Sequence, residues 1–134
     1  MPIFSVVIAE DHPAFRQMLR LELQAVQGVA IVGEASDGRQ LLDILQVVTP
    51  DLVILDISMP NLGGLEAARI IKQDHGRIKI LFLTMHKNPA YLAQARRLGA
   101  EGYLLKEELD QALLLAIDHI RAGKTYVSAA LAAE

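Results

Sequence analysis

Short apolar runs alternate with longer amphipathic segments along this chain. The runs are rich in Ile, Val, Leu and Phe, and they lie at 3–9, 29–35, 51–55, 78–83 and 101–105. Runs of this length without regular polar alternation are typical of strands that are buried on both faces of a parallel sheet. We therefore expect five parallel strands.

The segments between the runs carry apolar residues at helical spacing. Asp11 is well placed to cap the first helix, and Asn88 to cap the fourth. Gly99 suits the left-handed conformation in which many helices end. We expect helices at about 13–26, 38–47, 65–73, 88–99 and 108–122.

Strand and helix thus alternate five times, which predicts an α/β three-layer sandwich with right-handed crossovers. The chain has 134 residues, and residues 1–122 have the size of one domain. Residues 123–134 are mostly small and Ala-rich. We expect this tail either to begin a linker or to form a short docking helix.

Composition narrows the class of protein. The 13 basic and 16 acidic residues give a net charge of −3, which argues against nucleic-acid binding by this chain itself. No apolar stretch approaches the ~18 residues that span a bilayer, and the N-terminus lacks the basic region of a signal peptide. Cys is absent, which excludes disulfides and thiolate chemistry. We expect a cytoplasmic protein that does not contact a membrane.

Polar side chains follow four of the apolar runs. They are Glu10 and Asp11 after the first, Asp56 after the third, Thr84 after the fourth and Lys106 after the fifth. In open α/β sheets, ligands bind just beyond the carboxyl ends of the strands. The predicted fold therefore gathers three acids, a hydroxyl and an ammonium in one crevice. This combination suits a hard divalent cation together with a phosphoryl group.

The acids suggest both a metal site and a nucleophile. Asp11 and Asp56 would repel each other unless a pKa rises or a cation binds, and Mg²⁺ fits best because it takes few carboxylates and keeps its waters. Glu10 can contribute directly or through a water. Asp56 can attack activated phosphorus to give an aspartyl phosphate, a reaction that needs cationic stabilisation. Lys106 supplies that charge, and Thr84 supplies a hydroxyl.

These residues lie within motifs that together resemble the receiver domains of two-component response regulators. The motifs are Glu10-Asp11-His12-Pro13, Asp56-Ile57-Ser58-Met59-Pro60 with Gly63-Gly64, Leu83-Thr84-Met85-His86, and Gly99-Ala100 with Gly102-Tyr103-Leu104-Leu105-Lys106. The resemblance covers the chain to about Ser128. It implies a flavodoxin-like (βα)5 sandwich with a five-stranded parallel sheet in the order 2-1-3-4-5.

The resemblance also implies an acceptor and a metal site. Asp56 resembles the residue that accepts a phosphoryl group from a sensor histidine kinase. Asp11, Asp56 and the main-chain carbonyl of Ser58 resemble the Mg²⁺ ligands, with Glu10 as the supporting acid. The implied role is that of a signalling switch, with Mg²⁺-dependent self-phosphorylation and autodephosphorylation as its only chemistry.

The same resemblance implies how the switch works. Lys106 and Thr84 resemble the residues that hold the phosphoryl oxygens, and Tyr103 occupies the position of an aromatic switch residue. Phosphorylation would move Thr84, and Tyr103 would then rotate inward and change the surface of the fourth helix, fifth strand and fifth helix. A half-buried Tyr103 with its hydroxyl in water is the alternative.

The last helix suggests an interface apart from the resemblance. Leu114 and Leu115 broaden its apolar face, and we expect this face to contact another protein or to form a homodimer with a second copy.

Segments 32–35 and 122–128 are similar to one subfamily, the LuxR/NarL-type regulators, whose receiver precedes a DNA-binding helix-turn-helix domain. The chain would then contact DNA only through an output domain absent from it. It would then be either the receiver part of a transcription regulator or a stand-alone receiver. A further alternative is a degenerate receiver that serves as an interaction module. An aspartate-nucleophile phosphatase would need an acid two residues after Asp56, where Ser58 stands.

Overall fold

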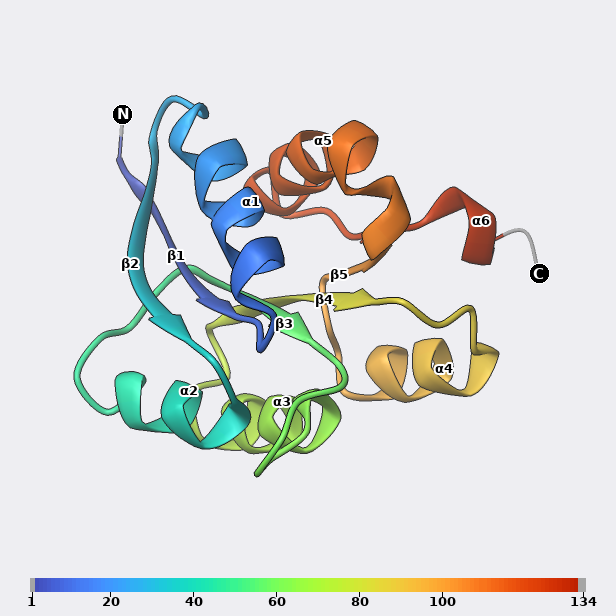
Figure 1. Ribbon diagram of the computed structural model, residues 1–134, viewed down its shortest axis with the longest axis horizontal. Coiled ribbons are helices and arrows are strands. Elements are labelled where there is room, and N and C mark those ends of the chain that lie inside the picture. The colour runs from blue at the N-terminus through green and yellow to red at the C-terminus, as the bar shows by residue number, and fades with distance from the viewer. Residues whose placement is uncertain (1, 133–134) are drawn as a thin grey trace.

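The computed structural model describes residues 2–132 and contains one parallel sheet between two layers of helices (Figure 1). The strand order is β2-β1-β3-β4-β5-β6. The strands are β1 (Phe4–Ala9), β2 (Val29–Ala35), β3 (Leu52–Asp56), β4 (Lys79–Thr84), β5 (Gly102–Leu105) and β6 (Tyr126–Val127). The helices are α1 (Pro13–Gln24), α2 (Gly38–Ile44), α3 (Gly64–Asp74), α4 (Pro89–Arg97), α5 (Leu109–Arg121) and α6 (Ala129–Ala132), and a 3-10 turn, η1 (Lys106–Glu108), precedes α5.

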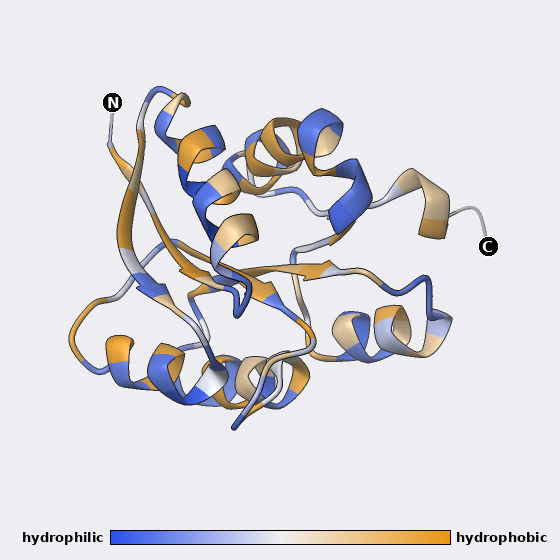
Figure 2. Cartoon of the chain, viewed as in Figure 1, coloured by the Kyte–Doolittle hydropathy of each residue, from blue (hydrophilic) through white to orange (hydrophobic). Residues whose placement is uncertain are grey.

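The two faces of the sheet bury separate apolar clusters. Helices α1 and α5 cover one face, and α2, α3 and α4 cover the other (Figure 1). Successive strand residues point to opposite faces. Leu104 therefore belongs to the cluster under α1 and α5, and its neighbour Tyr103 belongs to the cluster under α2, α3 and α4. Figure 2 shows apolar residues along the strands and polar residues on the outward sides of the helices. Burial on both faces explains why the strands read as continuous apolar runs.

The fold confirms the predicted α/β sandwich and its strand order, with one addition. The five predicted strands and five predicted helices are present, and no end is shifted by more than three residues. The sheet has six strands instead of five, because part of the predicted tail forms β6, which pairs in parallel with β5. Helix α6 follows, whereas Ala133 and Glu134 lie outside the described residues.

The predicted capping residues are confirmed for α4, whereas for α1 the predicted start at Pro13 is confirmed and the predicted cap is wrong. The side chain of Asn88 accepts a hydrogen bond from the amide of Ala90 at 2.9 Å, and Gly99 has a φ of +81°. In α1, His12 holds the N-cap position and makes no side-chain capping bond. The expected cap by Asp11 is therefore not formed, and its carboxylate lies in an acidic cluster instead.

No helix within residues 2–132 is long and apolar enough to cross a membrane.

Candidate functional site

The sheet register brings the predicted site residues to one edge. Asp56 ends β3 and pairs with Leu83, the residue before Thr84 in β4. Thr84 in turn pairs with Leu105, which precedes Lys106. Glu10 and Asp11 follow β1, the neighbour of β3 on its other side. The polar residues that end four separate strands are thus gathered as the sequence predicted.

Lys106 joins two buried carboxylates. Its Nζ lies 2.6 Å from Oε1 of Glu10 and 3.0 Å from Oδ2 of Asp56, to which it donates a hydrogen bond. Burial alone would lower the pKa of Lys106, but the contacts with Glu10 and Asp56 raise it above its ordinary value. The lysine is therefore held as an ammonium at neutral pH.

Asp56 carries a strongly shifted carboxyl group. Burial and the charge of Glu10 raise its pKa to about 7, although Lys106 opposes the shift. Its Oδ1 accepts a hydrogen bond from the amide of Ser58 at 3.2 Å. A second cation beside Asp56 would favour the ionised, nucleophilic form of this carboxylate.

The acidic cluster offers ligands for such a cation. Carboxylate oxygens of Glu10, Asp11 and Asp56 and a ring nitrogen of His12 all lie within 4.8 Å of one another. Oδ1 of Asp11 is buried and accepts no hydrogen bond within the described part of the chain, although His12 Nδ1 lies 3.3 Å away. Three carboxylates face the single ammonium of Lys106. This excess of hard oxygen donors and negative charge fits Mg²⁺.

The loop after β3 approaches Asp56 closely at Gly64. A Cβ added at Gly64 would lie 2.1 Å from the carbonyl oxygen of Asp56, whereas one at Gly63 would meet nothing nearer than 3.7 Å. The amide of Gly64 donates to the carbonyl of Ile57 at 2.8 Å. The second glycine of the pair therefore lets the start of α3 pack against the backbone of Asp56 and Ile57.

Thr84 and Tyr103, the expected switch residues, are both buried. Oγ1 of Thr84 accepts a hydrogen bond from the amide of His86 at 3.0 Å. Tyr103 is only 2% exposed, and burial raises the pKa of its hydroxyl to about 12. That hydroxyl faces Thr84 but forms no hydrogen bond of normal geometry with any described residue. Tyr103 therefore already points inward, and the alternative with its hydroxyl in water is wrong for this structure.

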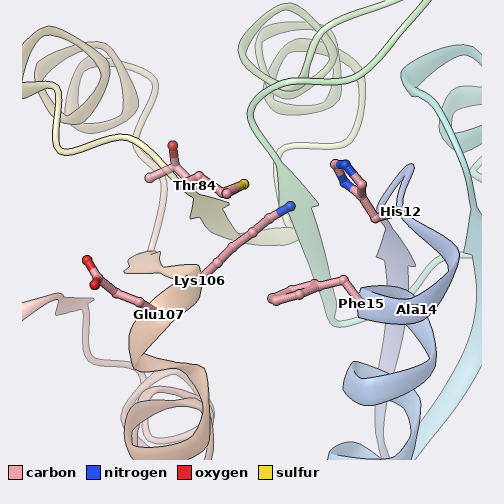
Figure 3. Close-up of a pocket in the computed structure, with 7 residues that line it drawn as sticks. His12, Ala14, Phe15, Thr84, Lys106 and Glu107 are labelled. Carbon is pink, nitrogen blue, oxygen red and sulfur yellow. The ribbon is translucent and has the colours of Figure 1, made fainter.

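A cavity of about 620 Å³ opens beside the cluster. It is lined by His12, Ala14, Phe15, Thr84, Met85, Lys106 and Glu107. In Figure 3, Lys106 and Phe15 extend toward each other from opposite walls, and Nζ of Lys106 lies 4.6 Å from the centroid of the Phe15 ring. The sequence did not single out Phe15, so its contact with Lys106 was missed.

Arg16 is a second residue that the sequence did not single out. Its Nη1 donates to the carbonyl of Glu10 at 2.7 Å, and its Nε lies 3.6 Å from a carboxylate oxygen of Glu34. Arg20 binds the same Glu34 through two hydrogen bonds of 2.6 and 2.7 Å. These contacts fix the position of Glu10 in the loop after β1. In the sequence, only the position of Arg16 one turn into the first helix indicated such contacts.

Comparison with known proteins identifies the class to which this fold and site belong. Residues 6–118 match the model of the response regulator receiver domain, and the chain belongs to this family. It is 34% identical over 130 residues to the response regulator UvrY of Escherichia coli (strain K12), with 97% of this chain and 60% of UvrY covered. The chain thus spans about three-fifths of the length of that relative.

Two solved structures show the same fold. A LuxR-family two-component response regulator from Aurantimonas sp. SI85-9A1 superimposes with a TM-score of 0.93 at 35% identity, covering 98% of this chain and 94% of that one. The isolated receiver domain of RcsB from Salmonella enterica serovar Typhimurium, solved in the presence of the phosphomimetic BeF3⁻, gives 0.92 at 30% identity, covering 97% and 96%. The chain is therefore a receiver domain of the LuxR/NarL type.

Proposed function

We propose that this receiver accepts a phosphoryl group on Asp56 from the phosphohistidine of a sensor histidine kinase. A carboxylate oxygen of Asp56 bonds to phosphorus while the phosphorus–nitrogen bond breaks, and the electron pair returns to the imidazole. The observation that carries this proposal is the ammonium of Lys106, held 3.0 Å from Asp56 on the wall of an open cavity. Lys106 would neutralise charge on the oxygens of the transferred phosphoryl group. The hydroxyl of Thr84 would donate a hydrogen bond to one of these oxygens.

Asp11, Asp56 and the main-chain carbonyl of Ser58 would hold Mg²⁺, with Glu10 as the supporting acid. The ion would supply neutralisation of the phosphoryl charge. The buried Oδ1 of Asp11, which lacks a hydrogen bond within residues 2–132, supports this assignment. The chain would have no enzymatic activity beyond Mg²⁺-dependent self-phosphorylation and autodephosphorylation.

The output of the switch is proposed from the relatives. The surface formed by α4, β5 and α5 would change on phosphorylation and control transcription through a DNA-binding domain like those that follow receivers of the LuxR/NarL type. Leu114 and Leu115 on α5 are 46% and 47% exposed, which supports pairing with a second copy. A kinase partner of this kind would be met in the cytoplasm.

The test is to incubate the chain with a small-molecule acyl phosphate and Mg²⁺ and to record its intact mass. We expect one added phosphoryl group that needs both Mg²⁺ and Asp56. Asp56→Asn should block the adduct, whereas Asp51→Asn, at the opposite end of β3, should not. An adduct that survives Asp56→Asn would contradict the proposal, and so would the absence of any adduct, which would favour an interaction module.

A further inference from the structure

The end of the described chain is held against β5 by backbone and side-chain contacts. The amide of Tyr126 donates to the carbonyl of Glu101 at 2.9 Å, and the amide of Ser128 donates to that of Tyr103 at 2.8 Å. A pairing of two residues is marginal by itself. Side chains must therefore help to hold this segment, and Ser128 and Leu131 are the two that become fully buried or nearly so.

Ser128 anchors the segment. Its exposed fraction is 0%, and its hydroxyl donates to the carboxylate of Glu108. A buried hydroxyl without a partner is costly, so this hydrogen bond favours the docked position. Leu131 packs in the same apolar cluster as Tyr103. The docked segment, which we call the tail clamp (residues 126–131), thus contacts β5 beside the expected switch residue.

The partner of Ser128 belongs to the turn that carries Lys106. Lys106 begins η1 and Glu108 ends it. The carboxylate oxygen that Ser128 contacts, Oε1 of Glu108, also accepts a hydrogen bond from the amide of Leu105 at 3.4 Å. One carboxylate therefore ties the residue before Lys106 and the residue two positions after it to the tail clamp.

The other end of Lys106 is fixed inside the site. Its ammonium lies 2.6 Å from Glu10 and 3.0 Å from Asp56. A phosphoryl group on Asp56 would offer this ammonium new oxygens and draw it toward them. Because η1 has only three residues, the backbone of Lys106 can move little without moving Glu108 as well.

We propose that Glu108 and Ser128 are positioning residues that hold Lys106 for the phosphoryl group and couple the site to the tail clamp. This inference rests on the proposed function, because it needs Asp56 to carry a phosphoryl group. Coupling between two sites is reciprocal. A ligand on Asp56 changes how firmly the clamp is docked, and loss of the Ser128 hydroxyl changes how firmly the ligand is bound.

The first test uses the unmodified chain. Amide hydrogen exchange of the peptide that contains Tyr126 and Ser128 is measured with Mg²⁺ alone and with Mg²⁺ and BeF3⁻. We expect these amides to exchange at least about 3-fold more slowly with BeF3⁻ bound, because a clamp whose loss weakens the ligand must be held more firmly when the ligand is present, while exchange in β2 stays the same. Equal rates in both states, or faster exchange with BeF3⁻, would overturn the proposal.

The second test uses three variants and the affinity for BeF3⁻ at saturating Mg²⁺, measured by titration calorimetry. Ser128→Ala should weaken binding by about 3- to 10-fold. Glu108→Gln keeps a carbonyl acceptor of the same length and should stay within about 2-fold of the parent chain. Ser5→Ala is the matched control, since the Ser5 hydroxyl also donates to an acid, Asp51 at 3.1 Å, but lies at the opposite end of the sheet.

The outcomes separate the two proposals. Equal affinities for Ser128→Ala and Ser5→Ala would show that Ser128 has only a general structural role and would overturn the inference. If Asp56 of the parent chain accepts neither a phosphoryl group nor BeF3⁻, the proposed function and the inference both fail. If the parent chain is phosphorylated on Asp56 and the tail-clamp amides exchange unchanged, only the inference fails.

Discussion

Lys106 and Asp56 lie 50 residues apart in the sequence and form a hydrogen-bonded ion pair of 3.0 Å in the fold. The same ammonium contacts Glu10 at 2.6 Å, so one cation serves two buried carboxylates. Asp11 adds a third carboxylate to the cluster. Lys106 therefore neutralises only part of the local charge, and the remaining negative charge supports the proposed Mg²⁺ site beside it.

Replacing Lys106 by Ala should destabilise the metal-free chain. The change leaves Glu10 and Asp56 buried without their counterion, which we expect to lower the free energy of unfolding by about 3 kcal/mol. Urea denaturation in the presence of a chelator measures this loss. Mg²⁺ should restore part of the stability, because it would replace the missing positive charge.

Lys124→Ala removes an exposed lysine and serves as the control. We expect it to change the free energy of unfolding by less than about 0.5 kcal/mol. A Lys106→Ala chain as stable as this control would show that the ion pair contributes no net stability. A loss that Mg²⁺ does not reduce would argue against a cation site at these carboxylates.

The raised pKa of Asp56 predicts a pH dependence of stability. The pKa is about 7 in the folded chain against an ordinary value of 3.8, so between these values the folded state holds a proton that the unfolded state has lost. The free energy of unfolding should therefore rise as the pH falls through 7 and level off near 4. Asp56→Asn removes this dependence and should be more stable than the parent chain by about 1–3 kcal/mol at pH 8.

Thermal or urea unfolding from pH 8 to pH 5 in a chelator tests this expectation. Asp43→Asn, at an exposed position of α2, is the matched control and should follow the parent chain. A stability advantage of Asp56→Asn that stays constant over this range would mean that Asp56 does not titrate there.

Phe15 should tune the chemistry of Lys106 without being required for it. The ring lies 4.6 Å from the ammonium, within the range of a cation–π contact worth about 0.5–2 kcal/mol. Phe15→Leu should slow phosphoryl uptake from a small donor by about 3-fold or more, whereas Phe15→Tyr keeps the ring and should act like the parent chain. Equal initial rates for all three chains by intact mass would exclude a role for the ring.

The two adjacent glycines near Asp56 should differ sharply in their tolerance of Ala. A Cβ at Gly64 would overlap the Asp56 carbonyl, while one at Gly63 has space. We expect Gly64→Ala to lose more than about 2 kcal/mol of stability and Gly63→Ala less than about 1 kcal/mol. Urea unfolding of both variants provides the comparison, and similar losses would contradict the close approach at Gly64.

The strands and most of the site were predictable because burial on both faces leaves a continuous apolar run, and a polar residue then marks where the strand ends. Asp56, Thr84 and Lys106 each follow such a run, so their convergence required only a parallel sheet. The inward position of Tyr103 was not decided by its sequence. A four-residue strand has no periodicity that shows how deeply one aromatic is buried. The burial of Tyr103 instead depends on the helices that cover its face of the sheet.

The last strand was missed for a different reason. Tyr126 and Val127 are too few to give a periodic signal, and the need to cover β5 appears only once the sheet order is known. The contact of Ser128 with Glu108 joins residues 20 positions apart through a turn whose geometry the sequence does not specify. Asp11 was expected to cap α1 because acids often do, but the acidic cluster holds it.

Reductive trapping shows whether the carboxylate of Asp56 becomes an acyl phosphate. Borohydride converts an aspartyl phosphate to homoserine, which peptide mass spectrometry locates within the sequence. After treatment with an acyl phosphate donor and Mg²⁺, we expect homoserine at position 56 alone, and none when Mg²⁺ is chelated. Homoserine at another aspartate, or an unreduced Asp56 in a chain that has gained the mass of a phosphoryl group, would contradict this expectation.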